Sequence, residues 1–230
     1  SQVAEEIEDL IESQTNPTIA PYAKTGEVHL RITAKGKNEK ECKKLIKPVV
    51  KELKARFGRN IFATEESKSL EEAVVDMLKE QEMTLSLAES CTGGAIAARI
   101  VNVSGASEVF LQGMVTYSNK AKRRCLDVSK STLKKHGAVS EECAAEMAKG
   151  GRKASKTDIC LSVTGIAGPG GGTKEKPVGT VFMGCSYKGC TQVREFHFQG
   201  NRARVREQTV AHGLAFLRDC MMERADKENN

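Results

Sequence analysis

At 230 residues the chain can form one large domain or two modest ones, and its 39% hydrophobic and 29% charged residues are typical of a soluble globular protein. No apolar run approaches the roughly 20 residues of a membrane span, and the first residues lack the basic and apolar regions of a secretion signal. The net charge of +6 suits a phosphorylated small molecule or weak contact with nucleic acid, whereas 4% aromatic residues and no Trp argue against a base-stacking surface.

The eight cysteines are scattered along the chain, and no two of them form a Cys-x-x-Cys pair. Several lie in apolar strand patterns, as Cys160 and Cys185 do. Buried free thiols in a reducing compartment explain this pattern better than disulfides or a zinc site. The sequence therefore predicts a cytoplasmic protein with neither a metal nor a cofactor.

The first 66 residues predict a small α+β domain. Apolar side chains at helical spacing predict a helix over 2–13, and alternating ones predict a strand over 27–34. A second helix is expected to begin at Asn38 and to kink or begin near Pro48. Gly58 is its expected C-cap, and 60–63 is a predicted short strand.

The polar run over 64–69 predicts a domain boundary, so that the domains cover 1–66 and 67–230. In the second domain predicted strands and helices alternate, as in an α/β fold. The predicted strands cover 84–88, 109–116, 158–164, 177–187 and 190–198. The predicted helices follow caps at Ser69 and Ser140, run from Gly93 to about Val103 and over 131–136, and begin at Asn201. The tail over 226–230 is expected to be disordered.

Three polar segments, 89–94, 117–122 and 164–172, each follow the carboxyl end of an apolar strand. In layered α/β folds such ends converge on one crevice where ligands bind. Together the segments offer hydroxyl groups, a lysine and a glycine-rich loop. Each also has a simpler interpretation, as a helix cap, a charged turn or a flexible loop.

The segment around Ser90 joins a strand to a helix N-terminus, where backbone N–H groups have no intrahelical partner. Such a corner suits an anionic ligand or a developing anion, and Gly93 and Gly94 allow close approach. It is not the Gly-x-Ser-x-Gly elbow of the hydrolases, because Ala88 stands at the first glycine position. An ordinary capped helix is the alternative.

The glycine-rich loop over 165–172 is neither a P-loop nor a Gly-x-Gly-x-x-Gly motif. A phosphate site built from its backbone N–H groups remains open. Arg202 and Arg206 lie one helical turn apart and could form bidentate hydrogen bonds with the same phosphate. The alternative for these arginines is a solvated basic face.

Five motifs, at 88–94, 115–122, 137–140, 164–169 and 176–181, resemble the CinA C-terminal domain, a family that includes bacterial nicotinamide mononucleotide amidohydrolases. Residues 16–24 and 26–33 resemble the KH-like middle domain of full-length CinA proteins. The resemblance implies a three-layer α/β/α amidohydrolase domain preceded by a small α+β KH-like domain. The N-terminal, molybdopterin-binding-like domain of that family, linked to ADP-ribose pyrophosphatase activity, has no counterpart here.

The resemblance further implies hydrolysis of the carboxamide of nicotinamide mononucleotide to nicotinic acid mononucleotide and ammonia. Ser90 corresponds to the nucleophile and Lys122 to the general base, with Tyr117 also in the catalytic set. The implied substrate-binding residues are Thr92, Gly93, Gly94, Thr164, Gly165, Ala167, Gly168, Arg202 and Arg206. No metal and no cofactor is implied, and a homodimer is expected.

Several alternatives stay open. Cys91 is a rival nucleophile, because thiolates attack well and a helix N-terminus lowers a thiol pKa. Lys122 can act as a base only if burial or nearby positive charge lowers its pKa, and the cationic neighbours Lys120, Arg123 and Arg124 are candidates for that charge. The chain could instead be an amidase for another carboxamide. It could also be a catalytically degenerate nucleotide- or nucleic-acid-binding module linked to competence or DNA damage, although nucleic acid is disfavoured because the Gly-x-x-Gly loop of KH modules is absent.

Overall fold

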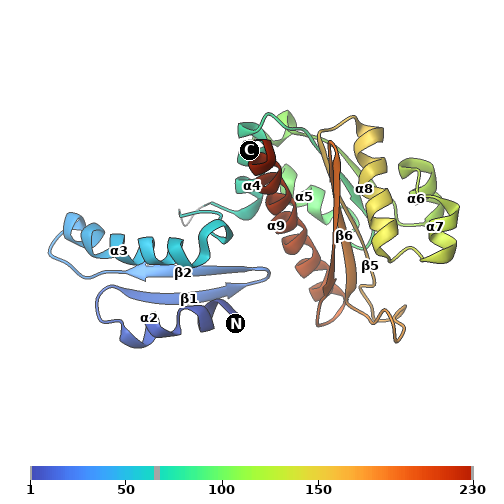
Figure 1. The fold of residues 1–230 in the computed structure, drawn as a ribbon. Coiled ribbons are helices and arrows are strands. Elements are labelled where there is room, and N and C mark those ends of the chain that lie inside the picture. The colour runs from blue at the N-terminus through green and yellow to red at the C-terminus, as the bar shows by residue number, and fades with distance from the viewer. Residues whose placement is uncertain (1, 65–67, 229–230) are drawn as a thin grey trace. The chain divides into compact units, whose positions relative to one another are not determined.

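The computed structural model describes residues 2–64 and 68–228. The chain divides into two compact units, Ser1–Glu66 and Ser67–Asn230, and each is described by itself (Figure 1). No helix in the described part of the chain is long and apolar enough to cross a membrane.

The first unit is a β-hairpin with helices before and after it. Its elements are α1 (Gln2–Glu6), α2 (Glu8–Ser13), β1 (Thr18–Lys24), β2 (Glu27–Thr33), α3 (Glu39–Phe57) and the 3₁₀ turn η1 (Gly58–Asn60). Ile7, Ile19 and Leu53, one each from the α1–α2 junction, the hairpin and α3, form a small core. Because so few apolar side chains are buried there, the unit has a thin core for its size.

The structure differs from the sequence-based expectations for this unit in three features, and it shows that the second helix begins after Asn38 and not near Pro48. The helix over 2–13 is interrupted at Ile7, whose side chain is fully buried. The strand β1 was not predicted, and the predicted strand over 60–63 does not form, because η1 occupies its start and no neighbouring strand pairs with it. The helix α3 continues through Pro48, which is exposed, so water can bond the carbonyl that the proline leaves free.

In its described part, the second unit contains a five-stranded sheet and six α-helices. The strands are β3 (Leu85–Glu89), β4 (Phe110–Val115), β5 (Ile159–Gly165), β6 (Thr180–Tyr187) and β7 (Cys190–His197). The helices are α4 (Leu70–Glu80), α5 (Ala95–Val101), α6 (Asn119–Leu126), α7 (Lys130–Lys135), α8 (Glu141–Ser155) and α9 (Arg202–Glu228), with a 3₁₀ turn η2 (Ala106–Glu108).

The sheet order is β4-β3-β5-β6-β7, and it is mixed. Strands β4, β3 and β5 are mutually parallel, whereas β5, β6 and β7 follow one another antiparallel. Every residue of β3 and β6 is buried, as expected for strands covered on both faces. The three parallel strands end at one edge of the sheet, so the predicted convergence of the three polar segments is confirmed.

Helices cover both faces of the sheet (Figure 1). Helix α8 packs on one face with α6 and α7 outside it, while α4, α5 and α9 lie on the other face. Gly150 of α8 allows the closest approach, since a Cβ atom there would lie 1.8 Å from the Leu126 carbonyl oxygen at the end of α6. Because Gly150 has no side chain, the end of α6 can pack directly against the backbone of α8.

Local signals explain most helix boundaries in this unit. Ser69 and Glu72 form a complete capping box at the start of α4, and Ser140 caps α8 as predicted. The segment over 117–122, for which a charged turn was the simpler interpretation, leads into helix α6, capped by the Ser118 side chain. The tail prediction is wrong for 226–228, which continue α9, and residues 229–230 lie outside the described residues, as do 65–67 of the predicted linker.

Candidate active site

Ser90 and Lys122 lie in direct contact at the edge where the parallel strands end. Ser90 follows β3, and its N–H donates to the Val163 carbonyl of β5 over 3.0 Å, which continues the strand pairing. Lys122 comes from the first turns of α6, and its Nζ lies 2.8 Å from Ser90 Oγ. The same Nζ donates to the Thr116 carbonyl over 2.7 Å, so the amine is oriented by a fixed backbone group. This geometry is what a Ser–Lys pair requires.

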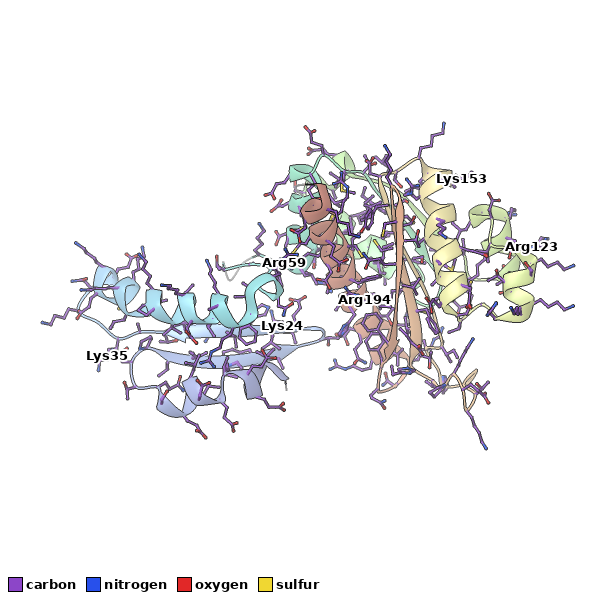
Figure 2. All side chains as sticks on the ribbon, in the orientation of Figure 1. Lys24, Lys35, Arg59, Arg123, Lys153 and Arg194 are labelled. Carbon is purple, nitrogen blue, oxygen red and sulfur yellow. The ribbon has the colours of Figure 1, made fainter. Side chains whose placement is uncertain are left out.

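Burial gives Lys122 the properties of a base. Its side chain is 1% exposed, and this desolvation lowers its pKa below the ordinary 10.5. The expected cationic neighbours have no part in this, because Lys120, Arg123 and Arg124 are all exposed. Figure 2 shows Arg123 pointing outward from α6. The proton affinity of Lys122 is therefore lowered by loss of water and not by like charge.

Cys91 does not have the properties of an attacking thiolate. It is 6% exposed, and burial raises its pKa to about 11. The expectation that a helix N-terminus lowers this pKa is wrong, because desolvation outweighs the neighbouring Lys122 and Arg206 charges. At neutral pH the sulfur carries its proton, so the geometry favours Ser90.

Glu89 occupies the N-terminus of α5. Its carboxylate is 1% exposed and accepts from the N–H groups of Gly94, Ile96 and Ala97 over 3.0, 3.2 and 2.9 Å. The turn that permits this uses Gly93 and Gly94 at φ of 62° and 94°, which favour glycine. The protein's own carboxylate therefore uses these helix N–H groups, and a ligand in this turn would have to use other donors.

We expect Glu89→Ala to lower the free energy of unfolding by about 2–5 kcal/mol, because it leaves three N–H donors in or near the core without an acceptor. The corresponding fall in Tm is roughly 5–15 °C, measurable by thermal unfolding followed by circular dichroism. Glu108→Ala is the matched control, since Glu108 is 66% exposed and pairs only at the surface with Lys79. A loss for Glu89→Ala no larger than that of the control would show that the cap is dispensable.

Few donors in the turn remain open. Among the described residues, the backbone N–H of Thr92 has no acceptor, and that of Cys91 contacts only its own thiol. The side-chain hydroxyls of Thr92 and Thr116 are also buried without a hydrogen-bond partner. Buried polar groups are seldom left unpaired. These groups flank Ser90 and the carbonyl that holds Lys122, so they are the available donors for a ligand at the pair.

Arg202 and Arg206, from the start of α9, contact all three strand-end segments. Arg206 donates from Nε to the Cys91 carbonyl over 3.0 Å and from Nη2 to the Thr92 carbonyl over 2.8 Å. Arg202 donates to the Gly168 carbonyl over 2.9 Å and to the Tyr117 hydroxyl over 3.0 Å. They are therefore not merely a solvated basic face. Tyr117 itself is 62% exposed and touches neither Ser90 nor Lys122 by a hydrogen bond in the described structure.

The predicted glycine-rich cradle divides into parts with different roles. Gly165 is the last residue of β5 and pairs with Val181, so it belongs to the sheet. The Thr164 hydroxyl donates to the Ala138 carbonyl over 2.7 Å and is engaged by the protein. Ala167 and Gly168 are buried in the loop that follows.

Sequence reasoning missed two further contacts that shape the site. Lys176 donates to the His136 and Val139 carbonyls over 2.8 and 2.6 Å, which fixes the turn before α8 beside the loop. Glu89 was also missed as a cap. Lys176 acts on backbone atoms of a distant segment, and Glu89 acts on those of the turn and helix that follow it. A carboxylate shortly before a helix start was the available signal for Glu89.

Two protein-family models match this chain, one for each unit. Residues 67–221 match the family model described as the CinA C-terminal domain, and residues 1–63 match the model described as the damage-inducible protein CinA KH domain. The first match alone covers more than half of the chain.

The chain belongs to the CinA family.

Relatives within the CinA family are similar over nearly the whole chain. A competence-damage inducible protein of Clostridium novyi is 50% identical over 227 residues, which are 99% of this chain and 55% of that protein. A CinA-like protein of Kosmotoga olearia is 50% identical over 220 residues, which are 96% of this chain and 53% of that protein. The chain therefore spans about half the length of these relatives.

A solved structure supports the same membership. A CinA superfamily protein from Klebsiella pneumoniae has a TM-score of 0.65 and 34% identity, covering 67% of this chain and 96% of that one. The predicted CinA resemblance and the predicted mixed α/β fold class are thus confirmed.

Proposed function

We propose that the second unit hydrolyses the carboxamide of nicotinamide mononucleotide to nicotinic acid mononucleotide and ammonia. The observation that carries the proposal is the 2.8 Å contact between Ser90 Oγ and a buried Lys122 Nζ at the strand-end edge. An amide needs an activated nucleophile, and a lysine of lowered pKa can activate a serine at neutral pH. Membership of the CinA family supports the choice of this unit as the active one.

In the proposed reaction, Ser90 is the nucleophile and Lys122 transfers the protons. Neutral Lys122 accepts the hydroxyl proton of Ser90 while Oγ attacks the carboxamide carbon, and the carbonyl oxygen becomes an oxyanion. The protonated Lys122 then gives its proton to the leaving nitrogen as the carbon–nitrogen bond breaks, which releases ammonia and leaves an acyl-enzyme. Water attacks the acyl carbon, its proton passes to Lys122, and Ser90 leaves with that proton restored.

The oxyanion is expected to be bound by the N–H group of Thr92, which has no acceptor, and by that of Cys91, which contacts only its own thiol. Donors fixed in advance near the position where negative charge develops contribute much of the rate in acyl transfer. The N–H of the residue after a nucleophile commonly serves this role in hydrolases. Because Glu89 already caps α5, these two are the donors of the turn that a substrate can use.

The test is ammonia release from the mononucleotide, nicotinamide, and unrelated amides such as asparagine and glutamine. The proposal predicts turnover of the mononucleotide well above that of every other compound. Equal turnover of asparagine or glutamine would favour an amidase of another specificity. No release from any of them would favour a non-catalytic role.

We expect chelation to leave the reaction unaffected. The described residues contain no group of three or more His, Cys, Asp or Glu side chains placed to hold a metal ion, and the Ser–Lys chemistry needs none. Ammonia release after dialysis against EDTA should stay within about twofold of the untreated rate, since a metal-dependent hydrolase would lose its activated water. Loss on chelation with recovery on adding zinc, magnesium or manganese would mean that the site has been misassigned.

A further inference from the structure

The exposed side of α3 in the first unit carries an unbroken row of lysines. Lys40, Lys44, Lys47, Lys51 and Lys54 recur at intervals of four, three, four and three residues, the spacing that keeps side chains on one helix face. All of them are exposed, and we name this row the lysine stripe. At 1.5 Å per residue the stripe extends about 21 Å along the helix axis.

The opposite face of α3 is already used. Val49, Leu53 and Phe57 pack into the small core of the first unit. These three apolar side chains are therefore already packed against the protein and are not available to insert into a lipid bilayer, as those of an interfacial helix would be. Figure 2 shows long side chains projecting from α3 on the side away from β2.

Within the described part of the chain, no member of the lysine stripe has an ion-pair partner. The acidic residues of α3 have other partners: Glu39 pairs with Lys43 over 2.6 Å, Glu52 pairs with Arg56 over 2.8 Å, and Glu41 accepts from the Lys37 N–H over 2.6 Å. Like charges three and four residues apart on a helix repel and destabilise it. A uniform stripe is thus costly unless a polyanion compensates the charge, whereas an ordinary solvated face mixes both signs.

We propose that the lysine stripe binds the phosphate backbone of nucleic acid without reading base sequence. One strand of a duplex carries a phosphate about every 3.4 Å along the axis, so about six phosphates span the length of the stripe. Contacts of this kind need only cationic side chains in a row. The absent Gly-x-x-Gly loop, which disfavoured nucleic acid in the sequence, is therefore not required. The stripe lies in the first unit, so the inference is independent of the amidase proposal.

Fluorescence anisotropy of the full chain with a labelled, mixed-sequence DNA duplex of about 20 base pairs at low salt tests the proposal. The variant Lys44→Glu/Lys47→Glu/Lys51→Glu is expected to bind at least about tenfold more weakly, and the slope of log K against log salt should become shallower by about 3, as for three lost duplex phosphate contacts. The matched control is Lys134→Glu/Lys135→Glu/Lys174→Glu, which reverses three exposed lysines of the second unit. Each triple reversal lowers the net charge of +6 by six, to zero. The control should bind within about threefold of the unmodified chain.

Four results would overturn the inference. The unmodified chain could leave the anisotropy unchanged, or both triple variants could weaken binding equally, which would assign it to net charge alone. Phosphatidylserine vesicles could bind in a stripe-dependent way while DNA does not, which would assign the stripe to membranes. If the glutamate variant loses its circular dichroism signal, Lys44→Gln/Lys47→Gln/Lys51→Gln replaces it, and DNA binding by that variant equal to the unmodified chain would also refute the proposal.

Discussion

Replacing Ser90 with alanine, or Lys122 with methionine, is expected to lower kcat/KM for mononucleotide deamidation by about 10⁴-fold or more, because either change removes one half of the nucleophile–base pair. The double variant should be scarcely slower than either single one, since the two groups act as a unit. Ammonia release under substrate-limited conditions measures the effect. Cys91→Ala should retain most activity, because the Cys91 thiol stays protonated at neutral pH.

The Lys122→Met variant also separates lost chemistry from lost folding. Burial lowers the pKa of Lys122 in the folded state, so between that value and the ordinary 10.5 the unfolded chain binds more protons. The free energy of unfolding of the unmodified protein therefore rises with pH across this window, and methionine removes that contribution. The variant should be at least as stable as the parent at pH 7, as measured by urea unfolding. An active Ser90→Ala protein beside an inactive Cys91→Ala protein would overturn the assignment.

The pH dependence of the reaction follows from the same shift. Catalysis requires neutral Lys122, so kcat/KM should rise with pH and level off above the folded-state pKa, which lies below 10.5. If the Cys91 thiolate were the nucleophile, kcat/KM would instead rise near pH 11, the pKa of the buried thiol. The position of the ascending limb thus distinguishes the two nucleophile assignments without any substitution.

Nicotinamide riboside is expected to react about 10²–10³-fold more slowly than the mononucleotide, because charge-assisted hydrogen bonds to the phosphate are absent and their energy no longer orients the carboxamide. Arg206→Ala should reduce this preference by about 10–100-fold, the value of one such bond. The ratio of the two kcat/KM values is the measurement. The variant should slow both substrates somewhat, because Arg206 also binds the Cys91 and Thr92 carbonyls.

Arg204→Ala is the control, since Arg204 lies on the same helix, is exposed and pairs with Glu207. It should leave the preference unchanged. If riboside and mononucleotide react alike in the unmodified protein, phosphate recognition is wrong. If they differ and Arg206→Ala preserves the ratio, the phosphate is bound by other residues.

The sequence predicted well what local patterns determine. The buried strands of the second unit are apolar runs bounded by glycine and polar residues, and the caps at Ser69 and Ser140 are local hydrogen bonds. Strand β1 was missed because Pro21 lies within it and its alternation is weak, so pairing with β2 decides its conformation. Helix α6 was missed because it is short and highly charged, and tertiary packing stabilises it.

The site required contacts that local patterns cannot supply. Ser90 and Lys122 are 32 residues apart, and only the convergence of parallel strands together with the family resemblance indicated that they meet. The direction in which the Cys91 pKa is shifted depends on burial, and a sequence does not show how deeply a side chain is buried. Glu89 binds backbone atoms of the turn and helix that follow it, and Lys176 binds those of a distant segment, and such atoms carry no residue-specific signal.

The two arginines of α9 also make three distant stretches of chain into one cooperative element. Arg202 and Arg206 bind the segments after β3, β4 and β5 from a single helical turn. Fraying of that turn would remove these four hydrogen bonds together, so the three segments are expected to loosen in one step despite their wide separation in sequence. A ligand bound there would then slow amide exchange in all three segments together.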